Sequence, residues 1–471
     1  MTVRARGTLL ESTPVQQGAG VGMSHTSAIK DALHKVNRVA AGFTQWSGLG
    51  PSEIRRRLLK AAELFDQRRS DLAAAMAEEV GATPNWSEFN IATAIGMLEE
   101  AASLTTQVTG SVMPSNRRGV TALGVRQPVG VVLAIAPWNA PVVLAVRSVA
   151  TPLACGNTVI LKASEICPRT HLLVAEILRE AGIGEDVLQV VTNTPEEASG
   201  IVEALIAHPA VRRVNFTGST RVGRLVAMAA AQHLKPALLE LGGKAPLVVL
   251  DDADLDAAAE AALFGGFANQ GQICMSTERI VIDDAVADSF AERLAAAAAR
   301  LTAGPVGSGH PLGPVVGLDA GERIEALIQD AIAKGARVLA GGRAHSTHFD
   351  ATVVDMVTPN MRLYAEECFG PVVSIVRVHG DEEAIRVAND TEYGLSSAVF
   401  SRDVQRALGV ARRLETGICH INAASVEDEP HMPFGGMKSS GHGRFGGSAA
   451  IEEFTELRWI TISSQRRTYK F

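Results

Sequence analysis

From residue 131 onward the sequence alternates short runs of aliphatic and β-branched residues with longer stretches rich in Ala and Leu. The first runs are VVLAI at 131–135, TVILK at 158–162, VLQVV at 187–191, VRRVNF at 211–216 and APLVVL at 245–250. An uninterrupted apolar run predicts a strand covered on both faces, and an amphipathic helix between two such strands predicts that they pair in parallel. We therefore expect an α/β protein built from doubly wound sheets.

A second block of the same kind follows, with strand-like runs at 278–283, 335–340, 369–378, 396–401 and 417–422. The block predicts a second α/β domain. Ahead of both blocks, helical periodicity extends from Thr26 to Leu104, with an expected break at the Gly-Leu-Gly-Pro sequence of residues 48–51.

Two segments fit neither block, one from Ser111 to Arg126 and one from Phe454 to Ser464. Both are rich in β-branched residues and are predicted as strands. Exposed strand edges are able to pair with another chain, so we expect a small β-element that joins subunits into a homodimer or homotetramer.

Composition excludes several classes of partner. The chain of 471 residues has 44 Lys and Arg against 51 Asp and Glu, a net charge of −7, without a basic cluster for nucleic acid or a membrane surface. The apolar stretch at 131–156 is interrupted by Pro137, Asn139, Pro141 and Arg147, so we expect no membrane span. Five widely spaced Cys favour a reducing, cytoplasmic location and argue against disulfides or a metal site.

Two glycine-containing motifs resemble phosphate-binding loops. The motif at 18–22 follows no strand and is set aside, whereas Phe216 to Gly223 lies between a predicted strand and a predicted helix, where small residues let a pyrophosphate approach backbone N–H groups. An ordinary helix cap after a tight turn remains the alternative. At the end of a neighbouring strand, Lys162 and Glu165 could hold ribose hydroxyls or form a solvated charge pair.

Cys274 differs from the other four cysteines because it lies in a polar, glycine-containing loop, where a nucleophilic thiolate is expected. Glu240 lies 34 residues upstream and is followed by Leu241, Gly242 and Gly243. The glycines leave a carboxylate free to move as a general base. The other cysteines are expected to be small buried hydrophobic residues.

These features belong to a series of seven motifs that follow one another along the chain. Together the motifs resemble the aldehyde dehydrogenase superfamily over nearly the whole chain. The resemblance is greatest to its salicylaldehyde, vanillin and benzaldehyde dehydrogenase branch. The motifs are Pro137-Trp138-Asn139, Lys162 with Glu165, Phe216–Ser219, Glu240–Lys244, Gly271–Cys274, Glu366–Pro371 and Pro433–Gly436.

The resemblance implies two Rossmann-like domains and a small β-element. Residues 1–23 would form an N-terminal arm, 24–108 and 129–241 the NAD-binding domain, 242–447 the catalytic domain, and 109–128 with 448–471 the oligomerisation element.

The resemblance also implies NAD(P)-dependent oxidation of an aldehyde, aromatic by the branch it resembles, to the carboxylic acid through a thiohemiacetal and a thioester. Cys274 would be the nucleophile, Asn139 an oxyanion donor together with the Cys274 N–H, and Glu240 the base for hydrolysis. NAD is expected to be preferred over NADP because Glu165 would repel a 2′-phosphate. The cofactor would be bound by Pro137, Trp138, Lys162, Ser164, Glu165, Phe216, Gly218, Ser219, Gly223, Leu241, Glu367 and Phe369.

Substrate selection is assigned to residues near Asn139 and Cys274. They are Ala140, Leu144, Arg147, Phe267, Ala268, Ile273 and Met275. Small side chains at Ala140 and Ala268 would leave room for a flat ring, and Arg147 would bind a ring hydroxyl or carboxylate. Pairing of Arg147 with Glu427 or Asp428 is the structural alternative.

Other functions remain open from the residues alone. An aliphatic aldehyde or semialdehyde would suit the same chemistry. A non-redox hydrolase of thioesterase type would use Cys274 and Glu240 without the cofactor residues, and a non-catalytic protein could retain the fold.

Overall fold

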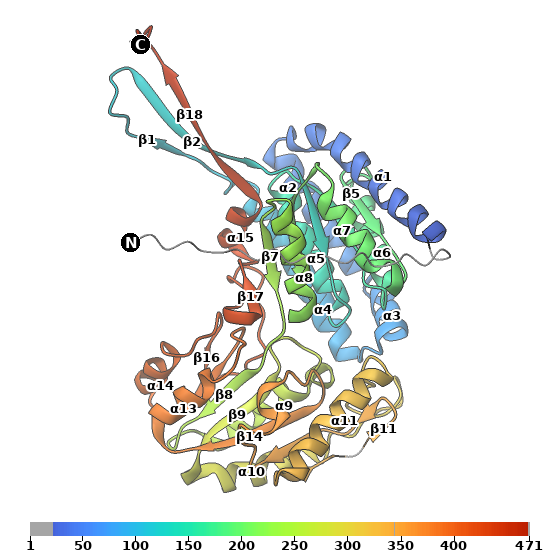
Figure 1. The fold of residues 1–471 in the computed structure, drawn as a ribbon, viewed down its shortest axis with the longest axis vertical. Helices are drawn as coiled ribbons and strands as arrows, with labels where there is room; N and C mark the ends of the chain where they lie inside the picture. The colour runs from blue at the N-terminus through green and yellow to red at the C-terminus, as the bar shows by residue number, and fades with distance from the viewer. Residues whose placement is uncertain (1–21, 343, 470–471) are drawn as a thin grey trace, which may run out of the picture.

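The computed structural model of the chain describes residues 22–342 and 344–469. Figure 1 shows two α/β lobes and a long β-ribbon that extends away from them. The predicted arm and the glycine motif at 18–22 lie, apart from their last residues, outside the described part of the chain.

The N-terminal helices are α1 (Gly22–Ser47), α2 (Pro51–Gln67), α3 (Arg69–Val80) and α4 (Pro84–Leu104). The expected break at 48–51 is confirmed, because Gly50 precedes α2 in an extended conformation and Pro51 occupies its first turn. The Thr83 side chain accepts a hydrogen bond from the Trp86 N–H and caps α4, which again begins at a proline.

The first lobe contains a six-stranded sheet in the order β17-β7-β6-β3-β4-β5, parallel except for β17. Its strands are β3 (Val131–Ile135), β4 (Thr158–Lys162), β5 (Leu188–Val191), β6 (Val211–Thr217), β7 (Ala237–Glu240) and β17 (Gly441–His442). Its connecting helices are α5 (Pro141–Ala154), α6 (Pro168–Glu180), η1 (Pro195–Glu197), α7 (Ala198–Ala207) and α8 (Thr220–Gln232).

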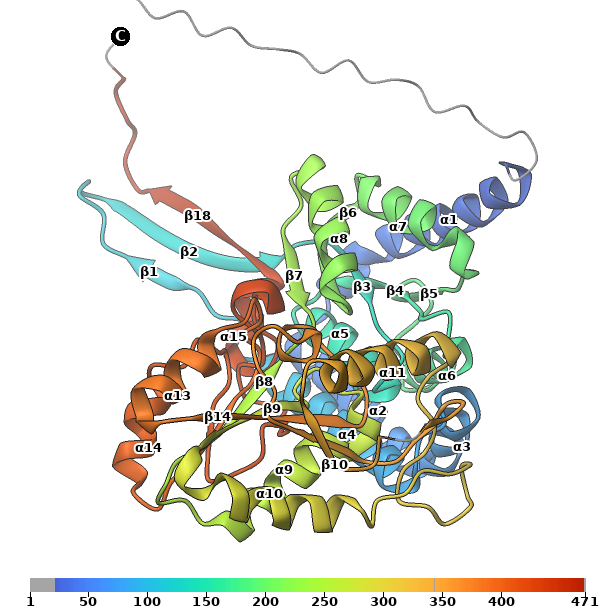
Figure 2. The ribbon, with the colours of Figure 1, turned by 60° about the horizontal axis from the view of Figure 1, so that its bottom comes forward.

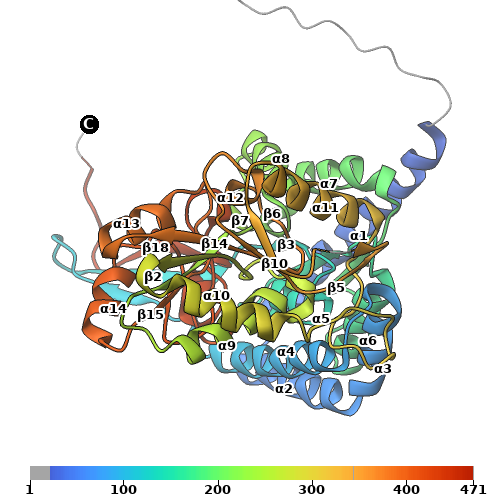
Figure 3. The same cartoon turned by 90° about the horizontal axis from the view of Figure 1, so that it is seen from below.

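Both faces of this sheet are covered by helices, as Figure 3 shows. Alternate residues of β3 point to opposite sides: Val132 packs with α2, α4, α5 and α6, whereas Leu133 packs with α1, α7 and α8. This double burial explains why the strands are mostly apolar.

The second lobe contains a seven-stranded sheet in the order β10-β13-β14-β9-β8-β15-β16, with only β10 antiparallel. Its strands are β8 (Ala245–Val249), β9 (Thr277–Asp283), β10 (Arg337–Ala340), β13 (Thr352–Asp355), β14 (Val372–Val378), β15 (Ala398–Phe400) and β16 (His420–Ile421). The other elements of this lobe are α9 (Leu255–Phe267), η2 (Ala268–Gly271), α10 (Asp284–Ala298), α11 (Leu318–Ala333), β11 (Ala344–His345), β12 (His348–Phe349), α12 (Arg362–Ala365), α13 (Gly380–Asn389), α14 (Val404–Ala411) and η3 (Lys438–Ser440).

The protruding ribbon is a three-stranded antiparallel sheet of β1 (Ser111–Met113), β2 (Val120–Pro128) and β18 (Thr455–Ser463), seen from a second side in Figure 2. β18 pairs with β2 along its whole length, from Thr455 opposite Pro128 to Ser463 opposite Val120. The two segments that fitted neither block are thus strands, and they pair with each other. The short helix α15 (Gly447–Glu453) leads into β18.

The α/β class and the doubly wound sheets are confirmed. Across the described residues, every helix is too short or too polar to cross a membrane.

Candidate active site

Cys274 follows a loop with an unusual backbone between α9 and β9. Asn269 and Gln270 have φ angles of 47° and 55°, in the left-handed region that few residues other than glycine adopt. A side chain at Gly271 would place its Cβ 2.1 Å from the carbonyl oxygen of Gly370, so this position requires glycine. The loop leaves Cys274 partly exposed.

The other cysteines behave as expected for small hydrophobic residues. Cys155, Cys167 and Cys368 are buried, and burial raises the pKa of each thiol to about 12. Cys419 is partly buried, and burial raises its pKa as well. What separates them from Cys274 is their position, since none of the four lines the cleft that contains Cys274.

Glu240 ends β7, and the two glycines that follow it allow the backbone to approach the cysteine loop. A Cβ at Gly243 would lie 2.2 Å from the carbonyl oxygen of Cys274, and one at Gly242 would lie 2.6 Å from a carboxylate oxygen of Glu367. The sequence suggested that these glycines free Glu240 to move. The structure gives them a second role, which is close packing against both neighbours.

The electrostatics of Glu240 and Cys274 are coupled. Burial raises the pKa of Glu240 to about 7, while the Cys274 thiol and the charge of Arg147 act to lower it and the charge of Asp428 acts to raise it. Burial and the negative charge of Glu240 raise the pKa of Cys274 well above its usual value. Glu240 Oε1 is buried without a hydrogen-bond partner in the described structure. A carboxylate with a pKa near 7 is suited to accept a proton at neutral pH.

Asn139 lies between β3 and α5, on the same cleft as Cys274. Its side-chain Nδ2 donates to the carbonyl oxygen of Gln272 at 3.0 Å. An amide nitrogen carries two N–H groups, so the second is available to a ligand.

A cleft of about 490 Å³ brings together eleven of the residues selected from the sequence. They are Pro137, Trp138, Asn139, Leu144, Gly218, Ser219, Glu240, Leu241, Cys274, Glu367 and Phe369.

Sequence reasoning missed four residues of the cleft, which are Thr217, Arg221, Gly242 and Arg323. The first three lie inside motifs that were recognised, and that position was a usable signal. Arg323 comes from α11 and donates to the carbonyl oxygen of Glu367 at 2.9 Å. No local pattern marks it, because the contact joins elements 44 residues apart.

Ser219 caps α8, and its hydroxyl accepts a hydrogen bond from the Val222 N–H at 3.4 Å. Phe216 and Gly223, two predicted cofactor residues of this motif, do not line the cleft and instead support the loop from beneath. A Cβ at Gly218 would lie 2.6 Å from the Phe216 ring, and one at Gly223 would lie 2.3 Å from Leu241. Phe216 therefore packs beneath the turn, and Gly223 lets α8 approach Leu241 closely.

Lys162 ends β4, and Ser164 and Glu165 follow the strand; all three lie outside the cleft. Lys162 forms an ion pair with Glu165, and Asn193 Nδ2 donates to Glu165 Oε1 at 2.8 Å. Burial opposes ionisation of Glu165, but hydrogen bonds from Lys162 and Asn193 hold its pKa below the usual value. The Ser164 hydroxyl accepts from the Ile166 N–H at 3.3 Å.

A buried ion pair shapes the loop that carries Glu367 and Phe369. Lys244 Nζ lies 2.7 Å from Glu278 Oε2, and both side chains are at most 3% exposed. The Glu278 carboxylate accepts from the N–H groups of Cys368 at 2.7 Å and Phe369 at 2.9 Å. The pair thus holds Phe369 at a φ of 48°.

The residues of this loop face the cleft from one side. The Phe369 and Trp138 rings meet edge to face, with centroids 5.8 Å apart. Glu367 Oε1 accepts from the Gly243 N–H at 2.7 Å. Burial and the charge of Glu278 raise the pKa of Glu367 to about 8.

Among the residues selected for substrate binding, only Leu144 lines the cleft. Phe267, Ile273 and Met275 are buried in hydrophobic cores, and Ala268 packs against the core that contains Ile273. Ala140 is buried at the start of α5.

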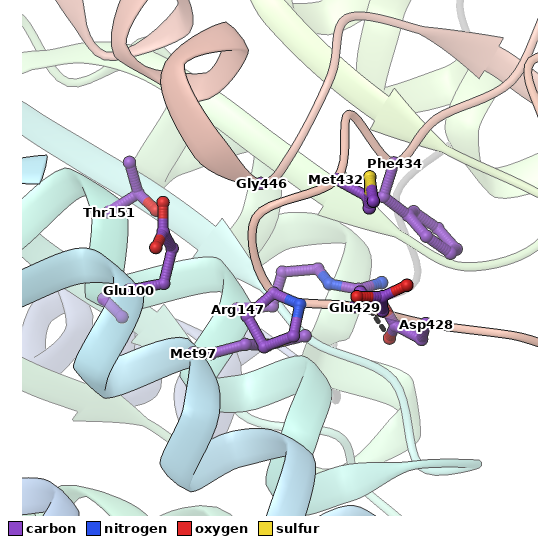
Figure 4. A pocket seen from close by; sticks show the side chains of 11 residues that line it. Met97, Glu100, Arg147, Thr151, Asp428, Glu429, Met432, Phe434 and Gly446 are labelled. Atoms are coloured by element: carbon purple, nitrogen blue, oxygen red, sulfur yellow. Dashed lines mark hydrogen bonds and ion pairs between the residues drawn. The ribbon is translucent and has the colours of Figure 1, made fainter. Parts of the chain in front are cut away.

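Arg147 pairs with Asp428, as the structural alternative predicted, and Figure 4 shows the two side chains meeting. Both side chains are 6% exposed, and the guanidinium lies 4.1 Å from the Phe434 ring centroid. The pair lines a cavity of about 20 Å³, room for about one water molecule. Glu100, Glu429 and other side chains complete its wall.

The described residues hold no group of three His, Cys, Asp or Glu side chains that could bind a metal ion.

Comparison with known proteins decides the family. A family profile described as "Aldehyde dehydrogenase family" matches residues 5–460. The chain belongs to the aldehyde dehydrogenase family. These enzymes oxidise aldehydes to acids, so membership favours the dehydrogenase over the hydrolase and the non-catalytic protein.

The relatives of this aldehyde dehydrogenase support the branch that the sequence resembles. The chain is 56% identical to a vanillin dehydrogenase of Pseudomonas sp. (strain HR199 / DSM 7063) over 94% of this chain and 92% of that protein. It is 47% identical to a salicylaldehyde dehydrogenase of Pseudomonas putida over 95% and 93% of the two chains. The crystal structure of a salicylaldehyde dehydrogenase from Pseudomonas putida G7 complexed with salicylaldehyde superposes with a TM-score of 0.92 at 47% identity, covering 94% of this chain and 92% of that one.

Proposed function

We propose that this enzyme oxidises an aromatic aldehyde to its carboxylic acid with NAD, using Cys274, Glu240 and Asn139. The observation that supports it most is the single cleft that brings a thiol, a buried carboxyl group with a pKa near 7 and a side-chain amide together with the cofactor motifs. The named relatives act on aromatic aldehydes.

In this mechanism Cys274 gives up its proton and its sulfur bonds to the aldehyde carbon, which makes a thiohemiacetal. The carbonyl oxygen becomes an oxyanion, which the second N–H of the Asn139 amide and the Cys274 backbone N–H stabilise. Glu240 lies beside the thiol and accepts the proton.

A bound NAD would supply the hydride acceptor needed to convert the thiohemiacetal into a thioester. Glu240 then releases the proton that it took from Cys274 to solvent and, as a carboxylate again, deprotonates a water molecule, which attacks the thioester carbon. The C–S bond breaks, the acid leaves and Cys274 regains its proton. Because the unpartnered Oε1 of Glu240 is buried, one water molecule would satisfy it and stand ready for this step.

The donor set fits a dinucleotide. The first turn of α8 offers backbone N–H groups and the Ser219 hydroxyl to a pyrophosphate, and Gly218 lets the Phe216 ring pack beneath this turn. Glu367 would accept from the hydroxyls of the nicotinamide ribose, and the rings of Trp138 and Phe369 offer a face to the nicotinamide. We propose that the first lobe, residues 24–108 and 129–241, binds NAD and that residues 242–447 carry the nucleophile.

The preference for NAD is assigned to Glu165, whose low pKa keeps it negative near a 2′-phosphate. Glu165→Gln should lower KM for NADP while Cys274-dependent turnover with saturating NAD is retained. Steady-state kinetics with both cofactors measure this. An unaltered ratio of the two KM values would remove Glu165 from cofactor selection.

For the substrate, Leu144 lines the cleft near Cys274, and Arg147 lies one helical turn further along α5. We propose that an aromatic ring lies against Leu144 with its far edge toward the Arg147–Asp428 pair. A polar group there favours rings that carry a hydroxyl over unsubstituted or aliphatic aldehydes.

A panel of hydroxybenzaldehydes, benzaldehyde, succinic semialdehyde and aliphatic aldehydes, assayed at about 340 nm with NAD, tests the proposal. The hydroxybenzaldehydes should have the highest kcat/KM, and Cys274→Ala should abolish turnover of all of them. Equal kcat/KM for aliphatic aldehydes would contradict the aromatic assignment, and residual dehydrogenation by Cys274→Ala would contradict the nucleophile.

We also propose that the enzyme is a homodimer or homotetramer joined through the β1-β2-β18 sheet. This sheet exposes Trp459 at 74% and Leu457 at 61% on one face and Ile462 at 57% on the other, which is unusual for a strand surrounded by water. Trp459→Glu should lower the mass measured by light scattering. An unchanged mass would place the interface elsewhere.

A further inference from the structure

The backbone carbonyl of Asn139 accepts hydrogen bonds from two side chains. The indole Nε1 of Trp86 donates to it at 2.9 Å, and Asn269 Nδ2 donates at 3.1 Å. Trp86 comes from α4, more than fifty residues earlier in the chain, and Asn269 comes from the left-handed loop before Cys274. The peptide that bears Asn139 is therefore fixed from both sides.

The segment around Asn139 has little means of fixing itself. Ala140 precedes α5 without a side-chain cap, and Pro141, the first residue of the helix, has no N–H to donate. The orientation of the peptide preceding α5 thus depends on groups from other elements.

The first turns of α4 are built to supply such a group. The Trp86 ring is 7% exposed and stacks on Phe89 with centroids 5.0 Å apart and planes 13° apart, so the direction of its N–H is fixed. Asn90, one turn later, accepts from the Val143 N–H through Oδ1 at 3.4 Å and donates to the Trp86 carbonyl at 3.0 Å. Helix α4 therefore contacts the start of α5 at two points.

We propose that Trp86 is a positioning residue, which fixes the peptide of Asn139 so that its side-chain amide points at the developing oxyanion. The inference rests on the role of Asn139 in the proposed function. It assigns Trp86 no contact with the substrate. Its effect on the reaction passes through Asn139, where a small misplacement of a donor reduces the rate strongly.

The first test is Trp86→Phe, which retains an aromatic ring beside Phe89 and removes the N–H. We expect kcat for aldehyde oxidation to fall about 10-fold, less than the loss of a whole oxyanion donor, with KM for NAD unchanged. Replacement of Trp86 by 3-benzothienylalanine, which retains the bicyclic shape without the N–H, should give the same kcat and covers the case in which the phenylalanine variant does not fold.

Trp46→Phe is a matched control, because Trp46, in α1, also donates through its indole to a backbone carbonyl of the α5 segment. The Trp46 indole is 1% exposed and donates to the carbonyl oxygen of Leu153, at the opposite end of α5 from Asn139, at 3.2 Å. Its loss should lower Tm by an amount similar to that of Trp86→Phe and leave kcat unchanged. An equal fall in kcat in both variants would show that any loosened α5 reduces the rate, and would overturn the proposal.

A double-mutant cycle with Asn139→Ala separates positioning from general stability. The carbonyl of residue 139 remains in Asn139→Ala, so Trp86→Phe should lower Tm equally in both backgrounds. Its effect on kcat should disappear when the side-chain amide is absent. Additive effects on kcat would overturn the inference about Trp86. Full activity of Asn139→Ala would instead show that the proposed function itself is wrong about the oxyanion donor.

Discussion

Two buried ion pairs flank the cleft, and they differ in what surrounds them. Lys244 and Glu278 are almost fully enclosed, and the Glu278 carboxylate also accepts from two backbone N–H groups. Arg147 and Asp428 instead border a small cavity, and their charges act on Glu240 with opposite sign. An enclosed and hydrogen-bonded charge such as that of Glu278 holds the neighbouring backbone in place. A charge that lies beside a titratable group, as Arg147 and Asp428 lie beside Glu240, is able to shift the pKa of that group.

The largest effect is expected from Glu278→Gln. The change leaves the Lys244 ammonium buried without a counter-charge and weakens the acceptor for two N–H groups, which should cost about 4 kcal/mol of unfolding free energy. Urea unfolding followed by fluorescence measures this. Asp256→Asn, which removes an exposed pair with Arg293, is the control and should cost less than about 1 kcal/mol. Equal losses in the two variants would refute the structural role.

Glu240→Gln tests the strain stored at the base itself. Because burial raises the pKa of Glu240 from 4.5 to about 7, the folded state binds more protons than the unfolded state between these pH values, so stability falls as pH rises through this window. The glutamine variant should therefore be more stable than the wild type by about 3 kcal/mol at pH 8, and not at pH 4.

The measurement is Tm as a function of pH, with Glu367→Gln as a parallel case because burial raises that pKa as well. A Glu240→Gln variant with the same Tm as the wild type at every pH would show that Glu240 is not strained in the folded enzyme.

Arg147→Met should cost about 2 kcal/mol, less than Glu278→Gln, because Asp428 can take up a proton when its partner is lost. Burial already raises the pKa of Asp428, and the Arg147 charge is what opposes this rise. The double variant Arg147→Met with Asp428→Leu should recover most of the loss. If the double variant is less stable than Arg147→Met alone, then Asp428 is not a destabilising buried charge in the single variant, and the proposed difference between the Arg147–Asp428 and Lys244–Glu278 pairs is wrong.

The smallest expected effect is a shift in the pH dependence of kcat/KM. This shift distinguishes the Arg147–Asp428 pair from the Lys244–Glu278 pair most directly. Since the Arg147 charge lowers the pKa of Glu240, Arg147→Met should move the rise of kcat/KM near pH 7 to higher pH, and Asp428→Asn should move it to lower pH. Glu278→Gln should leave its position unchanged. The pH profile of aldehyde oxidation is the measurement, and a shift of the same sign in Arg147→Met and Asp428→Asn would contradict the assignment.

Local patterns were sufficient for much of the fold and the site. Strands buried on both faces produce apolar runs, and Ser219 or Cys274 stand out because their motifs are contiguous. The partners across the fold could not be predicted. Arg323, Trp86 and Glu278 each act on a segment far away in the sequence, and nothing in the residues around them indicates which helix or loop they contact. The pairing of β2 with β18 is hidden for the same reason, since its halves are more than three hundred residues apart.

The short strand β17 determines how late in synthesis the sheet edge beside Glu240 is covered. It pairs with β7, the strand that ends at Glu240, and is formed by Gly441 and His442 close to the end of the chain. Until these residues emerge from the ribosome, β7 is an open edge and the base is not enclosed. Such distant pairings make folding slow, because a long loop must close before the contact forms. The sheet edge beside Glu240 is therefore completed only after His442 has been synthesised.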